Sequence, residues 1–170
     1  LASFERRKNH RIVFEAMRIP PASNYDLNLT LIHQATDEEK EMVSQKADGL
    51  NIEFLLPSSQ RDIADAFRNA DFSVLPSLAE GFGAPALESM ACGCPVILSK
   101  TNWFRLLSGD GDRAFLASPY DAEDWAKAIH QLVSDRKETD RKRQAALKFA
   151  QQFTWEQSAI DLIRLIEEKL

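Results

Sequence analysis

Short apolar segments alternate with helical segments over most of this chain of 170 residues. The apolar segments are rich in branched residues and are bounded by Pro, Asp or Ser, as is typical of buried strands. We expect strands at 27–34, 51–56, 71–75, 95–99 and 114–117, with helices at 37–47, after Ser59 and at 83–92. A further strand would end near Phe4. Strands that alternate with helices form βαβ units, which build a parallel sheet covered by helices.

After residue 120 the chain is predicted to be entirely helical. Asp121 is placed to cap one helix, a basic helix covers about 137–153, and Thr154 caps a last helix. That last helix carries an apolar stripe: Trp155, Ala159, Leu162, Ile166 and Leu170. No repeat or linker divides the chain. We therefore expect one α/β domain over 1–170, a Rossmann-like doubly wound parallel sheet with a C-terminal helical extension from about residue 121. In such a fold, ligands bind in the loops at the carboxyl ends of the strands, here those after residues 4, 56, 76, 99 and 117.

Composition excludes several classes of function. The net charge of −5 argues against general nucleic-acid binding. No apolar run approaches the roughly 18 residues of a membrane span, and the N-terminus lacks the pattern of a signal peptide. Cys92 and Cys94 flank one Gly without a second Cys or His pair for zinc, so two buried free thiols are expected. These features favour a cytoplasmic location, and Leu1, which is not Met, suggests an excised domain.

The loop after the strand at 71–75 carries the most unusual residues. Gly81 and Gly83 bracket Phe82 directly before a helix, where glycines allow close approach of a ligand and the helix N-terminus attracts anions. Turn geometry alone would also explain such glycines. Two carboxylates, Glu80 and Glu88, flank the loop. Glu88 could be an exposed helix residue, or it could accept hydrogen bonds from vicinal hydroxyls such as those of a ribose.

Two segments, 70–77 and 80–96, closely resemble the retaining glycosyltransferases of the GT-B fold, in the glycosyl transferases group 1 family. In that family a Glu, seven residues and a second Glu mark the donor site, as Glu80 and Glu88 do here. The resemblance extends to residues 7–10, 118–121 and 153–155 and so covers nearly the whole chain. It implies that the chain is the C-terminal, donor-binding half of an enzyme whose N-terminal acceptor-binding domain lies outside it.

The resemblance implies catalytic roles for Glu80, Lys8 and Arg7. Glu80 would hold the transferred sugar, while Lys8 and Arg7 would neutralise the diphosphate as it leaves. Fixed cations and a helix dipole can stabilise that charge, so neither a metal nor a tightly bound cofactor is expected. Without the resemblance, Arg7 and Lys8 would be interpreted as a solvated charged turn.

The same resemblance implies a site for a nucleotide sugar, GDP- or UDP-linked, which would be the substrate. Glu88 would bind the ribose, and Pro57 and Ser58 would lie near the base. Backbone amides of the glycine-rich loop would hold the β-phosphate: Gly81, Phe82 and Gly83. The first loop resembles relatives that use GDP-mannose, which favours a mannosyltransferase.

The chain departs from the family pattern at two places. Ser3 stands where many relatives have an Arg that binds the diphosphate. The segment 101–105 replaces small residues and a Pro-Glu pair, with Arg105 near the usual Glu. Within it, Trp103 could stack on a sugar or anchor the loop. These departures leave room for a non-catalytic nucleotide-binding or scaffolding domain.

The leading hypothesis is transfer of a hexose from a nucleotide sugar to a glycan, lipid or other acceptor with retention, as in polysaccharide biosynthesis. A sugar-nucleotide epimerase or phosphorylase of the same architecture is the alternative enzyme. The chain alone is expected to bind nucleotide weakly and to transfer little. A basic run at 136–143 could bind an anionic membrane surface or form a solvated helix face.

Overall fold

The computed structural model describes residues 5–32 and 35–168, so the strand predicted to end near Phe4 lies outside the described residues. Within them the chain forms five strands: β1 Asn28–Ile32, β2 Asn51–Leu55, β3 Ser73–Leu75, β4 Val96–Ser99 and β5 Phe115–Ala117. All strand pairs are parallel, in the orders β1-β2 and β3-β4-β5. The predicted α/β class is confirmed.

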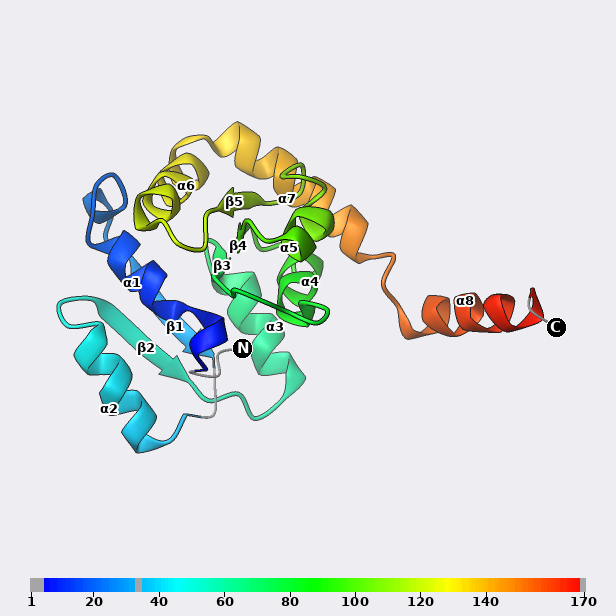
Figure 1. Cartoon of the computed structure of the whole chain (residues 1–170), viewed down its shortest axis with the longest axis horizontal. Helices are drawn as coiled ribbons and strands as arrows, with labels where there is room; N and C mark the ends of the chain where they lie inside the picture. The colour runs from blue at the N-terminus through cyan, green and yellow to red at the C-terminus, as the bar shows by residue number, and fades with distance from the viewer. Residues whose placement is uncertain (1–4, 33–34, 169–170) are drawn as a thin grey trace.

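Helices pack on both faces of the strands (Figure 1). They are α1 His10–Met17, α2 Asp37–Lys46, α3 Gln60–Asn69, α4 Ala84–Ala91, α5 Asn102–Ser108, α6 Ala122–Ser134, α7 Arg136–Ala150 and α8 Trp155–Glu167, with 3-10 turns η1 Arg6–Lys8 and η2 Ala22–Asn24. Successive side chains of a strand point to opposite faces of its sheet. Accordingly Ile97 packs in a core with α1 and α6, whereas Val96 and Leu98 pack in another with α4, α5 and α7. This two-sided burial makes the fold doubly wound.

Local sequence signals explain where several helices begin. Ser59 and Asp62 form a capping box at α3, because the Ser59 side chain accepts from the Asp62 N–H and the Asp62 side chain accepts in return. Asp121 caps α6 and Thr154 caps α8, as predicted. Pro85 lies in the first turn of α4, where its missing N–H leaves no helical bond unmade.

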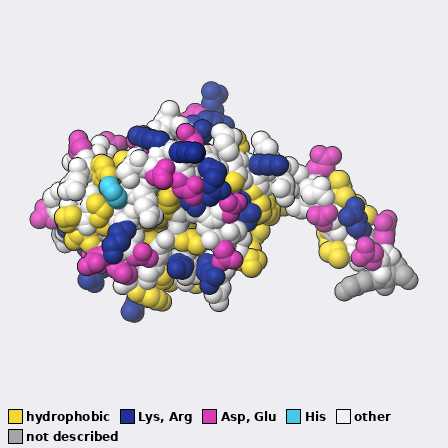
Figure 2. All heavy atoms as spheres, turned by 90° about the horizontal axis from the view of Figure 1, so that it is seen from above, with side chains coloured by type: hydrophobic (Ala, Val, Ile, Leu, Met, Phe, Trp, Pro, Cys, Tyr) yellow, Lys and Arg dark blue, Asp and Glu magenta, His cyan; other side chains and the backbone are white. Residues whose placement is uncertain are grey.

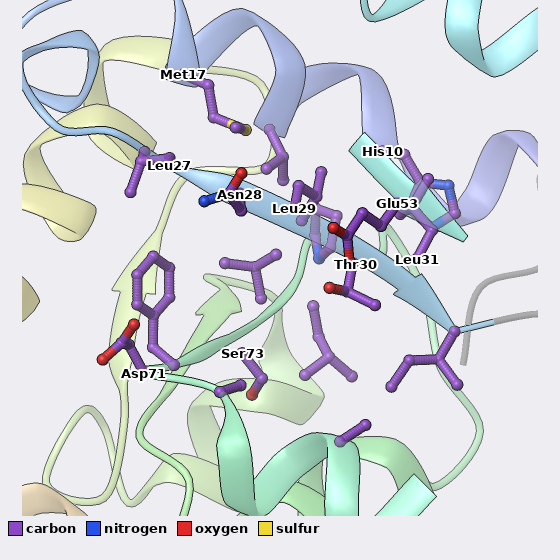
Figure 3. A pocket seen from close by; sticks show the side chains of 18 of the residues that line it. His10, Met17, Leu27, Asn28, Leu29, Thr30, Leu31, Glu53, Asp71 and Ser73 are labelled. Atoms are coloured by element: carbon purple, nitrogen blue, oxygen red, sulfur yellow. The ribbon is translucent and has the colours of Figure 1, made fainter. Parts of the chain in front are cut away.

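A cavity of about 570 Å³ separates the two sheets (Figure 3). Its walls are β1 and β3, which share no ladder, and apolar side chains of α1 and α3 also line it.

The C-terminal helices differ in their packing. Trp125 of α6 is fully buried and donates its indole N–H to the Ser118 carbonyl oxygen, at 2.9 Å. In contrast, α8 has no buried residue, Trp155 is 93% exposed, and Figure 1 shows the helix extending away from the sheets. The apolar stripe of α8 therefore has no packing partner within the described residues. None of the described helices has the length and apolar character needed to cross a membrane.

Candidate active site

Three loops meet at the carboxyl ends of β3 and β5. The Leu78 N–H donates to the Arg7 carbonyl oxygen at 2.7 Å, which ties η1 to the loop after β3. The Asn9 side chain donates to the carbonyl oxygens of Pro76, at 3.2 Å, and Pro119, at 2.8 Å. Asn9 has a left-handed backbone (φ 53°), a conformation that Asn adopts more readily than most residues. The loops predicted to follow residues 4, 76 and 117 therefore form one edge.

The three residues predicted to be catalytic lie together at this edge. Lys8 Nζ is 2.6 Å from Glu80 Oε1, and an Arg7 guanidinium nitrogen is 3.5 Å from Glu80 Oε2. The Lys8 and Glu80 side chains are only 13% and 9% exposed, so solvent screens their attraction weakly. Burial raises the pKa of Glu80, but hydrogen bonds from Lys8 and Ser77 and the positive charges of Lys8 and Arg7 outweigh it. The pKa of Glu80 is therefore below its ordinary value, and its carboxylate is charged at neutral pH.

Unpaired backbone N–H groups follow Glu80 directly. Among the residues that the structure describes, the N–H groups of Gly81, Phe82, Gly83 and Ala84 have no hydrogen-bond acceptor. Gly83 is the N-cap of α4 with a left-handed backbone (φ 72°, ψ 38°), which glycine adopts without strain. Together with the positive end of the α4 dipole, these N–H groups can bind an anion.

Glu88 lies one turn into α4, on the same element as this anion site. Its Oε2 atom is buried and has no hydrogen-bond partner in the described part of the chain. A buried carboxylate oxygen without a donor is costly, by about 1–3 kcal/mol or more. A ligand hydroxyl would supply the missing donor.

Comparisons with known proteins identify the family. The model of the family described as "Glycosyl transferases group 1" matches residues 1–149. The chain belongs to this family. Within it, the chain is a C-terminal domain of the GT-B fold.

This glycosyltransferase domain has relatives of known structure and name. It is 37% identical, over 112 residues, to D-inositol 3-phosphate glycosyltransferase of Stackebrandtia nassauensis; the match covers 66% of this chain and 25% of that relative. Sucrose-phosphate synthase from Thermosynechococcus elongatus superposes with a TM-score of 0.83 at 25% identity, over 99% of this chain and 44% of that one. Anabaena HepE, in complex with UDP-glucose, superposes with a TM-score of 0.81 at 22% identity, over 100% and 48%, which shows the shared fold alone. The chain thus spans only about a quarter of the curated relative's length.

Pro57 and Ser58, which are predicted to lie near the base, belong to a different loop from the charged cluster of Arg7, Lys8 and Glu80. Pro57 and Ser58 follow β2, and among the described residues no hydrogen bond joins them to Lys8 or Glu80. Instead, the Ser58 backbone and hydroxyl both donate to Asp62 Oδ2, each at 2.7 Å, at the start of α3. Their role in binding stays a prediction.

The segment that departs from the family pattern forms α5, a helix that the sequence did not predict. Thr101 caps it, Arg105 pairs with Asp110 at 2.8 Å, and the indole N–H of Trp103 donates to the Phe82 carbonyl oxygen at 2.8 Å. Of the two roles open to Trp103, the structure therefore shows the anchor. The cavity between the sheets (Figure 3) reaches the site at Lys8 and Ser77, but its lining includes neither Glu80 nor the glycine-rich loop.

Sequence reasoning missed one polar contact at the site. Ser77 is buried and hydrogen-bonds to Glu80, but a Ser three residues before a Glu carries no distinctive signal. Both cysteines are free thiols, with Cys94 buried and Cys92 only partly buried, and burial raises the pKa of each. Within the described residues, no group of three or more His, Cys, Asp or Glu side chains could hold a metal.

The basic run at 136–143 is largely neutralised on α7. Arg141 pairs with Asp112 at 2.6 Å and with Glu138 at 2.8 Å, and Arg143 pairs with Asp140 at 3.2 Å. Figure 2 shows Lys and Arg side chains interspersed with Asp and Glu on the face that it displays. This arrangement favours a solvated helix face, and association with a membrane surface stays a prediction.

Proposed function

We propose that this chain is the donor-binding domain of a retaining glycosyltransferase that moves a hexose from a nucleotide sugar to a glycan, lipid or other acceptor. The proposal rests on two neighbouring features of the site, an ion pair and a set of unpaired N–H groups. A largely buried Lys8–Glu80 ion pair adjoins a row of unpaired N–H groups at the start of α4. Cations and backbone donors in one place suit a diphosphate, which carries negative charge on several oxygens.

Glu88 would bind the ribose of the donor. Its buried Oε2 atom lacks a donor, and the hydroxyls of a ribose are neutral donors that match it. Because Glu88 and the unpaired N–H groups belong to one short helix and its cap, ribose and diphosphate could be bound side by side. This arrangement supports a nucleotide as ligand in preference to a free sugar phosphate.

Glu80, Lys8 and Arg7 would act on the reacting end of the donor. When the bond between the anomeric carbon and the phosphate oxygen breaks, negative charge accumulates on the leaving diphosphate. Lys8, Arg7 and the α4 N–H groups are fixed before the reaction and would stabilise that charge without reorganisation. Glu80 is charged at neutral pH, so it would hold Lys8 in place and accept hydrogen bonds from the transferred sugar.

The donor base and sugar are open within this proposal. The first loop favours GDP-mannose, whereas HepE, which shares the fold, binds UDP-glucose. The acceptor-binding domain would belong to a part of the enzyme outside this chain, because the match covers only 25% of the curated relative. We therefore expect nucleotide binding but little or no sugar transfer by the 170-residue chain alone.

Calorimetric titration of the chain with UDP-glucose, GDP-mannose and ADP-glucose tests the proposal. We expect weak, saturable binding of at least one donor, which Glu88→Gln and Lys8→Ala each reduce at least tenfold. Glu156→Gln and Lys127→Ala are the matched controls, because both side chains are exposed and lie on α8 and α6. Binding that survives Glu88→Gln and Lys8→Ala, or no binding of any donor, would contradict the proposal.

A further inference from the structure

Trp103 lies against the loop that carries the unpaired N–H groups. Its indole N–H donates to the Phe82 carbonyl oxygen at 2.8 Å. A Cβ atom placed on Gly83 would lie 3.3 Å from Trp103 Nε1 and 3.1 Å from Phe104 Cε1, so the backbone of the loop approaches α5 closely. The contact joins two segments that are 21 residues apart.

This hydrogen bond determines how one peptide group of the loop is turned. The Phe82–Gly83 peptide is trans, since the cis bond in the described chain joins Pro20 to Pro21. In a trans peptide the C=O and N–H bonds point in opposite directions. Because the Phe82 carbonyl oxygen faces α5, the N–H of Gly83 faces away from α5. Gly83 is buried, yet this N–H has no acceptor among residues 5–32 and 35–168.

Contacts between aromatic rings also hold this peptide in place, through the side chain of Phe82. The Phe82 ring lies 6.1 Å from the Trp103 ring and 6.1 Å from the Phe153 ring, in tilted and edge-on arrangements. Phe153 in turn packs edge-on against Phe149 at 5.0 Å, and the Arg113 guanidinium covers the Phe149 ring. Aromatic pairs in these geometries attract each other beyond simple burial. Rotation of the Phe82–Gly83 peptide would therefore disturb both the hydrogen bond and the cluster of rings.

We propose that Trp103 is a positioning residue of the donor site: it fixes the Phe82–Gly83 peptide so that the Gly83 N–H faces the diphosphate of the nucleotide sugar. This inference rests on the proposed function, since it assumes that the unpaired N–H groups bind phosphate. It assigns a function to the segment 101–105, in which the chain departs from the family pattern. Trp103 acts through the loop and does not touch the donor.

Trp103→Phe tests the inference, because it keeps an aromatic ring and removes the indole N–H. The probes are UDP, GDP and ADP, and the nucleoside that corresponds to the diphosphate bound best. We expect Trp103→Phe to weaken binding of the diphosphate about tenfold and to leave binding of the nucleoside unchanged, because only the phosphate contacts the Gly83 N–H. In wild type the amide signal of Gly83 should shift when the diphosphate binds, and in the variant this shift should shrink.

Trp155→Phe is the matched control, since Trp155 is 93% exposed on α8 and the chemical change is the same. It should leave both affinities unchanged, and thermal melting should show that both variants remain folded. Equal losses of diphosphate and nucleoside binding in Trp103→Phe would indicate a merely structural role and overturn the inference, as would no loss of either. If wild type binds none of the three diphosphates, the proposed function fails and this inference fails with it.

Discussion

Replacement of Lys8 by Met should destabilise the domain, because it leaves the Glu80 carboxylate without its closest cation. Exposed ion pairs contribute about 0–1 kcal/mol, whereas removal of one partner from a fully buried pair costs about 3–5 kcal/mol. The Lys8 and Glu80 side chains are 13% and 9% exposed and 2.6 Å apart, which places them near the buried limit. However, Arg7 remains 3.5 Å from the other carboxylate oxygen. We therefore expect a loss of about 2 kcal/mol in the free energy of unfolding, equivalent to about 4–8 °C in Tm.

The loss should depend on pH in a defined direction. The pKa of Glu80 is lowered in the folded state from its ordinary value of 4.5, so the ionised carboxylate stabilises the fold above that value. This contribution is lost as the pH falls through the lower pKa of the folded state. Urea unfolding of wild type and Lys8→Met, from about pH 7 to about pH 3, should show the stability difference shrinking toward the acid end.

Lys127→Met is the control for this experiment, because Lys127 pairs with Glu123 at 3.7 Å and both side chains are more than half exposed. Its effect should be below about 0.5 kcal/mol. Equal losses in the two variants would refute the claim that burial strengthens the Lys8–Glu80 pair. A difference that stays constant from neutral to acid pH would refute the assignment to the Glu80 charge.

Three further experiments test other parts of the structure. Gly83→Ala should cost about 1–2 kcal/mol in urea unfolding, because Ala is strained at φ 72° and its Cβ would crowd α5. Gly81→Ala, where a Cβ meets nothing within 4 Å, should cost clearly less, and equal costs would contradict both the strain and the crowding at Gly83. Ser59→Ala should remove about 1 kcal/mol with the α3 cap, measured in the same way, and an unchanged stability would show that the cap contributes nothing. Deletion of residues 154–170 should leave Tm unchanged, because α8 has no buried residue, and a lower Tm would reveal packing that the exposure of α8 does not suggest.

Elements that depend on local signals could be predicted from the sequence. The capping residues Ser59, Asp121 and Thr154 each accept from a backbone N–H two or three residues later, so their patterns are contained in a few positions. In contrast, α5 has only seven residues, too short for a clear helical period, and its cap at Thr101 does not by itself indicate a helix. The exposure of α8 could not be predicted either, because an apolar stripe indicates a face that can be buried but not which element would cover it.

The charged cluster could be predicted only in part. Lys8 and Glu80 are 72 residues apart, and the residues alone indicated no more than a charged turn and a glycine-rich loop. That Lys8 and Glu80 lie close together could be predicted only from the family resemblance, together with the rule that ligands bind at the carboxyl ends of parallel strands. The pairing of the strands was harder, since the division into β1-β2 and β3-β4-β5 depends on contacts between distant segments. The sequence likewise left two partners open for the indole of Trp103, a sugar or the loop, because the choice depends on where the loop lies in three dimensions.

The most direct test of the donor-binding claim is a map of amide chemical shifts in the chain as UDP, GDP or ADP is added. We predict that the amides of Gly81, Phe82, Gly83 and Ala84 shift most, because their N–H groups would gain phosphate acceptors. If the largest shifts were instead in β1 and β3, which line the cavity between the sheets, donor binding at the start of α4 would be contradicted. An absence of shifts with all three diphosphates would contradict it equally.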